Sequence, residues 1–442
     1  MVAALVSVRV RIRGLAHGGE GVGEQDDGLT WFVPGTLPGE IVDVEPERRK
    51  ARWARGRLLE VRQAGPDRTA PVCPLADRCG GCDWQHVALD RQGEHKRAIV
   101  ADQLRGLGIG LGIGLGIDPG QVQLASTPTA GLAYRRRVRL HYARDEHGGL
   151  RLGFFAPRSR AVVDVPRCPV LRPELDHAVQ RVRALAEHLP DHGELLGLSD
   201  GVCVVLALPG VRPEPDVRQA AQALLDERLV GIVLRGGRQR VTVGRHELGL
   251  DAGDGLPAMR ANPFVFCQAN AAVNRAMTRH VAQAARCDGR RVLELHAGAG
   301  NLTRALARTA RRVWTVDDDR EARDLLRAMA REQGLPINAK HGSADTLLQR
   351  LAQRGEHYDV VVVDPPRRGL GERSAAALAA VAQSRVVYVS CDPATLARDL
   401  RVLVDGGLRL CDVRVFDMMP MTAQVEVVAT LARPDAPEGV VI

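Results

Sequence analysis

The sequence predicts a multidomain protein with a small N-terminal β-barrel, a central α+β domain and a C-terminal α/β domain. Short alternating segments separated by glycine-rich turns fill residues 1–64, a spacing typical of a small OB-like barrel. Strand-like and helix-like patterns are mixed over residues 71–256. From residue 257 to 442, strands alternate with helices, which indicates a Rossmann-like parallel sheet covered on both faces. The length of 442 residues suits two to four domains at about 100–200 residues each.

The composition excludes several classes of protein. Hydrophobic residues make up 45% of the chain and charged residues 26%, so wholesale disorder is excluded. The net charge of +8 permits a polyanionic partner without requiring one. No uncharged apolar run reaches the roughly 18 residues that a membrane span needs. We therefore expect a cytoplasmic protein with no membrane partner, acting as a monomer.

The N-terminal region combines barrel-like strands with a basic stretch. Residues Val6–Arg13 alternate between apolar and polar side chains and precede a glycine-rich turn. Residues 48–57 then carry six basic side chains around Trp53 and no acidic one. An aromatic ring in a basic stretch is typical of nucleic-acid surfaces, where phosphate attraction combines with base stacking. A solvated basic loop would have the same composition, so both interpretations stand.

A cysteine cluster opens the central domain. Cys73, Cys79 and Cys82 lie within ten residues, and Cys168 is the best candidate for a fourth ligand. Such spacing suits a metal centre, but it does not separate a four-thiolate zinc site from a [4Fe–4S] cluster. Free structural cysteines are the remaining alternative. Residues Gly106–Ile117 alternate glycine with leucine or isoleucine, which predicts a flexible loop.

The C-terminal domain contains a glycine-rich turn with the features of a cofactor site. The run Glu294–Asn301 follows a predicted strand and opens a helix, so its glycines allow a ligand to approach the backbone. Asp317 ends the next predicted strand, where a carboxylate can accept both hydroxyls of a ribose. A dinucleotide fingerprint would have a third glycine where this chain has Thr303. The pattern therefore favours S-adenosylmethionine over NAD.

Two polar side chains follow neighbouring predicted strands at the same sheet edge, and a third lies within a later strand. Asp364 and Cys391 each follow a short apolar run, and Glu426 lies in an otherwise apolar strand. A buried cysteine is more often inert, yet a cysteine at a cofactor edge is a plausible thiolate nucleophile. Carbon 5 of uracil accepts a methyl group only after a thiolate has added to carbon 6, and a base must then remove the carbon-5 proton. One cysteine and one carboxylate suit that chemistry.

Several stretches resemble the RNA uracil-C5 methyltransferases. The N-terminal barrel resembles the TRAM domain that precedes the catalytic part in many of them. The most specific of the similar stretches is the Ser-Cys-Asp-Pro-x-Thr run. They are residues Phe266–Asn270, Glu294–Asn301, Asp364–Gly369, Ser390–Asp399 and Pro420–Glu426. The resemblance implies an RNA-binding barrel over residues 1–64 and an S-adenosylmethionine-dependent methyltransferase domain over residues 257–442.

The resemblance also assigns roles to individual residues. Cys391 would be the nucleophile and Glu426 the general base. The cofactor site would be lined by Gln268, His296, Asn301, Asp317, Ser343 and Asp364. Ser343 stands where relatives usually have Asp or Asn, which puts that contact in doubt. The cysteine run resembles the iron–sulfur branch of the family, which implies a [4Fe–4S] cluster held by Cys73, Cys79, Cys82 and Cys168.

The substrate follows from the resemblance alone. Family members with both a cluster and a TRAM domain are associated with 23S ribosomal RNA, whereas the tRNA enzymes usually lack the cluster. The target uracil would be flipped out of its stack into the pocket, which favours a loop. Two alternatives remain: the same chemistry on tRNA, and a non-catalytic RNA-binding or assembly factor with the same fold.

Overall fold

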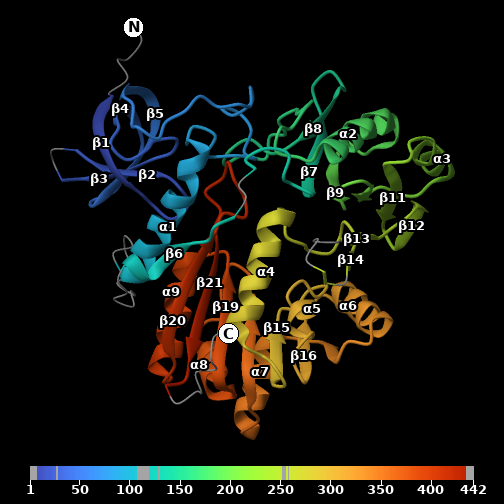
Figure 1. The fold of residues 1–442 in the computed structure, drawn as a ribbon. Coiled ribbons are helices and arrows are strands. Elements are labelled where there is room, and N and C mark those ends of the chain that lie inside the picture. Colours follow the sequence, from blue (N-terminus) through green and yellow to red (C-terminus); the bar gives the residue numbers. More distant parts are fainter. Residues whose placement is uncertain are drawn as a thin grey trace.

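The computed structural model describes residues 7–25, 28–106, 119–127, 130–250, 255–256 and 258–434. These residues form a closed barrel, a six-stranded sheet and an eight-stranded sheet. In Figure 1 the barrel and the six-stranded sheet lie side by side, and the eight-stranded sheet lies below both. Among the helices of the described residues, none is both long and apolar enough to cross a membrane. Residues 107–118, and with them nearly all of the glycine-rich insert, lie outside the described residues.

The N-terminal barrel is closed in the strand order β1-β2-β3-β5-β4, as the alternating pattern predicted. Its inward-facing side chains, among them Val10, Trp31 and Val42, are fully buried. Trp53 of the basic stretch packs edge-on against Phe32, with the guanidinium of Arg48 5.6 Å from its ring. The strands are β1 (Val8–Leu15), β2 (Gly21–Glu24), β3 (Thr30–Val33), β4 (Ile41–Arg49) and β5 (Trp53–Gln63).

The central sheet has the order β12-β11-β10-β9-β7-β8 and mixes parallel with antiparallel pairs. Its strands are β7 (Arg137–Arg144), β8 (Leu150–Gly153), β9 (His192–Ser199), β10 (Val204–Pro209), β11 (Leu229–Gly236) and β12 (Gln239–Gly244). Helices α2 (Pro173–Arg181) and α3 (Pro215–Ala223) cover it, and η2 (Val182–His188) continues α2. The short hairpin of β13 (Leu248–Leu250) and β14 (Met259–Ala261) leads into the C-terminal domain. This α+β arrangement agrees with the prediction from the mixed pattern.

The C-terminal sheet has the order β17-β16-β15-β18-β19-β21-β20-β6. Strands β15 to β19 are parallel, because each is followed by a helix that returns the chain to the same edge. These strands are β15 (Arg291–Leu295), β16 (Arg312–Asp317), β17 (Ile337–His341), β18 (Tyr358–Val363) and β19 (Ala382–Ser390). An antiparallel hairpin of β20 (Arg409–Phe416) and β21 (Glu426–Ala432) extends the sheet beyond β19. The helices are α4 (Ala271–Ala285), α5 (Thr303–Leu306), α6 (Arg320–Glu332), α7 (Ala344–Arg354), α8 (Glu372–Val381) and α9 (Pro393–Asp405).

A segment that precedes the central sheet packs against this C-terminal sheet. Strand β6 (Val122–Leu124), which follows the short helix η1 (Pro119–Gln121), pairs in parallel with β20. Helix α1 (Leu89–Arg105) lies against α9 and β20 and buries Val100 and Leu104 in the same apolar core. The helix therefore joins the barrel side of the molecule to the sheet that carries the predicted site (Figure 1).

Candidate active site

The carboxyl ends of the parallel strands form the edge at which the predicted site residues meet. Leu295 of β15 pairs with Val363 of β18, so the turn after β15 lies beside Asp364, and the Asp364 amide donates to the Leu295 carbonyl at 3.3 Å. The strand order reverses between β15 and β18, and ligands bind open α/β sheets at such a reversal. The fold thus places a ligand site at this edge.

The antiparallel strand β21 brings the predicted base to the predicted nucleophile. Ser390, the last residue of β19, pairs with Val427, the second residue of β21. Cys391 directly follows Ser390 and Glu426 directly precedes Val427, so both residues lie at this end of the strand pair, where the Glu426 charge acts on the Cys391 thiol. Antiparallel partners lie about 4.5–5.5 Å apart between their Cα atoms. The register alone therefore places the thiol and the carboxyl group at one point on the sheet edge.

The glycine-rich turn after β15 is shaped by three residues with positive φ. His296, Gly298 and Gly300 have φ values of +60°, +53° and +96°. A Cβ atom on Gly300 would lie 2.5 Å from Cδ1 of Leu326, so only glycine fits there. The Gly298 amide donates to Oδ2 of Asp317 at 2.7 Å, which ties the turn to the end of β16. Asp317 therefore keeps a fixed orientation beside the turn.

The other predicted cofactor residues lie at the ends of helices of the C-terminal domain or next to them. Gln268 is buried before α4, where its carbonyl oxygen accepts from Nε of Arg136 at 2.9 Å. The side-chain amide of Asn301 is paired reciprocally with that of Asn274 on α4, at 2.8 and 2.9 Å. Ser343 is exposed, and its hydroxyl caps α7 by accepting from the Thr346 amide. Asn301 and Ser343 thus already have structural partners.

Buried carboxyl groups give the cofactor side of the edge an unusual electrostatic character. Burial, reinforced by the charges of Asp364 and Asp317, raises the pKa of Glu294 to about 8. Burial, together with the charge of Asp317, raises the pKa of Asp364 to about 7. Oε2 of Glu294 has no hydrogen-bond partner within the described residues. Such a group of acceptors suits a ligand that offers positive charge and hydroxyl donors.

Burial and nearby carboxylates raise the pKa values of both the Cys391 thiol and the Glu426 carboxyl group. Burial raises the pKa of Cys391 to about 12, with a contribution from the Glu426 charge that the Arg367 guanidinium opposes. Burial and the Asp364 charge raise the pKa of Glu426 well above its ordinary range, and Arg367 again opposes the shift. Arg367 also donates to Oε1 of Gln424. Arg367 therefore favours the anionic forms of both residues.

Comparison with known proteins agrees with this geometry. A family model described as TRAM domain matches residues 7–59, one described as tRNA (Uracil-5-)-methyltransferase matches residues 169–322, and one described as Conserved hypothetical protein 95 matches residues 271–397. A protein of Chromohalobacter salexigens named 23S rRNA (uracil(1939)-C(5))-methyltransferase RlmD is 35% identical, over 97% of this chain and 90% of its own. The chain belongs to the RNA uracil-C5 methyltransferase family. The resemblance inferred from the motifs is therefore confirmed.

Two further relatives extend the comparison. A protein of the same name from Alkalilimnicola ehrlichii is 35% identical, with 96% of each chain covered. The crystal structure of the Pyrococcus abyssi tRNA (uracil-54, C5)-methyltransferase with S-adenosyl-L-homocysteine has a TM-score of 0.72 at 23% identity. It covers 96% of this chain and 99% of that one, so the whole fold is shared. The protein is thus an S-adenosylmethionine-dependent RNA uracil-C5 methyltransferase.

Residues that the sequence reasoning missed hold the methyltransferase site in shape. Asp399, which is fully buried on α9, accepts from the Tyr388 hydroxyl at 2.6 Å and from the Leu370 amide at 2.7 Å. It thereby fixes the loop that leads from Asp364 to α8. The side chain of Asp392, next to Cys391, caps α9 and contacts Nε2 of His17 from the barrel at 3.2 Å. The sequence did offer a signal for Asp399, because this charged residue lies at helical spacing from the apolar residues Leu396 and Leu403 in the helix that follows the Ser-Cys-Asp-Pro motif.

The four cysteines that the sequence suggests as metal ligands lie near one another, but among the described residues they do not form an assembled metal site. The Cys82 thiol lies close enough to Cys168 and Cys79 for their charges to raise its pKa, although burial has the larger effect. Cys73 acts on Cys79 in the same way, again after burial. Over the ranges that the structure describes, however, no three Cys, His, Asp or Glu side chains are grouped to hold a metal ion. The expected [4Fe–4S] ligand set is therefore not shown.

Proposed function

We propose that this methyltransferase modifies carbon 5 of a uracil in 23S ribosomal RNA through a covalent adduct with Cys391. The observation that carries the mechanism is the register of β19 and β21, which brings Cys391 and Glu426 to the same end of the strand pair. A thiol and a carboxyl group at one sheet edge, beside a cofactor turn, are the two groups that this reaction needs. The proposal goes beyond family membership because it assigns a role to each residue.

The chemistry proceeds in two stages on the uracil ring. The Cys391 thiolate forms a bond to carbon 6, and the electron pair of the 5,6 double bond moves into an enolate. Carbon 5 would then bond to the methyl group of bound S-adenosylmethionine, and the sulfur–methyl bond would break with its electron pair kept by sulfur, so that S-adenosylhomocysteine leaves. Glu426 removes the remaining carbon-5 proton, the double bond re-forms, and the sulfur–carbon bond to Cys391 breaks. Arg367 favours the thiolate in the first stage and the carboxylate in the second.

The residues around the glycine-rich turn would bind the cofactor. Asp317 would accept the ribose hydroxyls, while Gln268, His296 and Asn301 would line the pocket. The buried carboxyl group of Asp364 would face the positively charged sulfonium. Burial raises the pKa of Asp364 in the cofactor-free protein, and a bound cation would lower that pKa again by favouring the ionised form. Ser343, exposed and committed to the α7 cap, would make the weakest contribution.

The rRNA substrate is supported by the relatives. The proteins of C. salexigens and A. ehrlichii, which match almost the whole chain, are named for a uracil of 23S rRNA. The P. abyssi enzyme, named for a tRNA uracil, shares the fold at lower identity. The same chemistry on tRNA is therefore the second candidate.

The four cysteines Cys73, Cys79, Cys82 and Cys168 are included in the proposal as ligands of a [4Fe–4S] cluster. Four thiols in one neighbourhood are the donor chemistry that such a cluster uses. The cluster would order the segment rather than take part in methyl transfer. Iron and sulfide analysis of protein purified without oxygen tests this, with Cys79→Ser as the variant. Protein that is equally stable and active without iron would contradict it.

Methyl transfer from labelled S-adenosylmethionine to unmodified transcripts tests the function. We expect label at carbon 5 of a 23S rRNA uracil, no label with Cys391→Ala, and an SDS-stable RNA adduct with Glu426→Gln. Label on tRNA alone would keep the chemistry and overturn the substrate. Absence of label and of adduct on every RNA, together with normal cellular function of Cys391→Ala, would instead identify a non-catalytic RNA-binding protein.

A further inference from the structure

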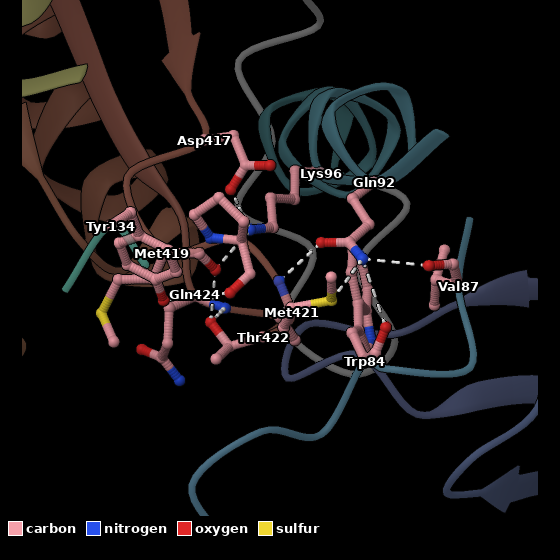
Figure 2. A network of polar contacts seen from close by, with 12 residues as sticks. Trp84, Val87, Gln92, Lys96, Tyr134, Asp417, Met419, Met421, Thr422 and Gln424 are labelled. Atoms are coloured by element: carbon pink, nitrogen blue, oxygen red, sulfur yellow. Dashed lines mark hydrogen bonds and ion pairs between the residues drawn. The ribbon is translucent and has the colours of Figure 1, made fainter. Parts of the chain in front are cut away.

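The loop that precedes Glu426 is held both by its own hydrogen bonds and by residues from distant parts of the chain. Residues 417–425 connect β20 to β21, and Glu426 follows directly. The Met421 carbonyl accepts from the Trp84 amide at 3.0 Å, and the Pro420 carbonyl accepts from the Tyr134 hydroxyl at 3.0 Å. Figure 2 shows Trp84, Tyr134 and two residues of α1, Gln92 and Lys96, around the loop. Segments far away in the sequence therefore help to fix the conformation of this loop.

Met421 lies at the centre of this support in a strained conformation. Its φ is +66°, a left-handed value that residues with a side chain rarely adopt. The Met421 amide donates to Oε1 of Gln92 at 2.7 Å. Nε2 of Gln92 donates in turn to the carbonyls of Trp84 and Val87, at 3.3 and 3.0 Å, which fixes the orientation of the amide. Strain of this kind persists only where the surroundings enforce it.

One turn further along α1, Lys96 holds the start of the same loop. Its Nζ atom lies 2.5 Å from Oδ1 of Asp417 and 3.1 Å from the Met419 carbonyl oxygen (Figure 2). Gln92 and Lys96 are both completely buried, so water does not replace these contacts. Helix α1 thus grips both halves of the loop from one face.

From this geometry we propose that Gln92 is a positioning residue for Glu426, acting through the strained backbone of Met421. The inference rests on the proposed role of Glu426 as the general base. A base must lie within hydrogen-bond reach of the proton that it removes. Glu426 is the first residue after the loop, so relaxation at Met421 shifts its carboxyl group relative to the ring held by Cys391.

The proposal predicts a specific block in the reaction. Thiolate addition and methyl transfer do not need Glu426, so they continue in a variant that lacks the Gln92 contact. Removal of the carbon-5 proton slows, and with it the re-formation of the double bond and the release of Cys391. The methylated RNA then accumulates as a covalent adduct. A displacement of about 1 Å costs on the order of 100-fold in rate, which sets the expected size of the release defect.

Gln92→Met, which keeps the volume and removes the amide, is the test variant. Single-turnover methyl transfer, release of methylated RNA, and SDS-stable adduct are measured against wild type and Glu426→Gln. Gln180→Met is the matched control, because Gln180 makes a similar bond to the Val165 carbonyl outside the site. We expect Gln92→Met to release product 10- to 100-fold more slowly, with methyl transfer within threefold of wild type and an adduct like that of Glu426→Gln.

A rescue separates positioning from general damage. Glycine tolerates the left-handed conformation without strain, so Gln92→Met/Met421→Gly is expected to recover at least threefold in release rate. Should Gln92→Met fail to fold, Tyr134→Phe removes the bond to Pro420 while keeping the ring, and a smaller release defect with adduct is expected. Folded Gln92→Met or Tyr134→Phe with wild-type release and no adduct would overturn the proposal. Absence of adduct with Glu426→Gln would instead refute the role of Glu426.

Discussion

The carboxyl group of Glu294 makes the stability of the cofactor-free protein depend on pH. This side chain is 2% exposed at the end of β15, and burial is the main reason that its pKa rises to about 8. The unfolded chain releases the same proton near the ordinary value of 4.5. Between these two values the folded state holds one proton more than the unfolded state. Its stability therefore falls as the pH rises from 4.5 to 8, and the dependence ends on either side.

The size of the effect follows from the two pKa values. Each pKa unit corresponds to about 1.4 kcal/mol, so the complete penalty is on the order of 4–5 kcal/mol above pH 8 and about 3 kcal/mol at pH 7. Glu294→Gln keeps the shape and removes the ionisation. We expect the free energy of unfolding of the variant to exceed that of wild type by on the order of 4–5 kcal/mol at pH 8 and about 3 kcal/mol at pH 7. At pH 4.5 the two free energies are expected to be equal.

Urea unfolding of cofactor-free protein across pH 4.5–8.5 measures this difference. Glu187→Gln is the control, because Glu187 is exposed and its loss changes no buried charge. Subtracting the wild-type curve from each variant removes the contributions of groups that do not interact with Glu294, whereas the relief of Asp364 from the Glu294 charge is part of the measured difference. A difference between Glu294→Gln and wild type that stays constant with pH would refute the reasoning, and so would a difference equal to that of Glu187→Gln.

Three further predictions concern the Lys96–Asp417 ion pair, the glycine-rich turn after β15 and the proposed nucleophile Cys391. Lys96→Met leaves Asp417 buried and unpaired and should cost about 3–5 kcal/mol in urea unfolding, most of which Lys96→Met/Asp417→Leu recovers. Gly300→Ala should lower S-adenosylmethionine affinity at least tenfold by calorimetry, because its Cβ collides with the α6 side chain behind the turn. Arg367→Met should slow adduct formation and move its pH dependence upward, because the guanidinium lowers the pKa of Cys391.

Each of these predictions has an outcome that contradicts it. For the Lys96–Asp417 ion pair, a double variant Lys96→Met/Asp417→Leu as unstable as Lys96→Met would contradict the prediction. The loss of stability would then not arise from the unpaired charge of Asp417. For the turn, unchanged affinity in Gly300→Ala would show that the backbone accommodates the methyl group. For the nucleophile, an Arg367→Met pH profile that coincides with wild type would remove the guanidinium from thiolate formation.

Local patterns in the sequence were sufficient for the order of the elements. The strand predicted before the glycine-rich turn is β15, because a short apolar run ended by such a turn carries its own signal. The apolar runs predicted before Asp364 and Cys391 lie in β18 and β19, where their side chains are buried. Parallel strands end at one edge by construction, so the meeting of Asp364 with the glycine-rich turn also followed from the pattern.

The contacts between distant segments did not follow from any local pattern. Gln92 and Met421 are 329 residues apart, and the basis of their contact is the burial of α1 against the β20 side of the sheet. The pairing of β6 with β20 is of the same kind. Arg367 belongs to a recognised motif, yet its closeness to both Cys391 and Glu426 depends on the path of the loop that Asp399 holds.

The sequence by itself determined the barrel, the α/β order, the family and the chemical identity of the candidate nucleophile, base and cofactor turn. These depend on side-chain type and on periodicity, which are local properties. Only the tertiary structure decided that Cys391 and Glu426 lie at the same end of the neighbouring strands β19 and β21. It also decided that buried carboxyl groups lie together at the cofactor edge, and that α1 holds the loop before Glu426. Proximity and burial set these features, and both arise only when segments far apart in the chain pack together.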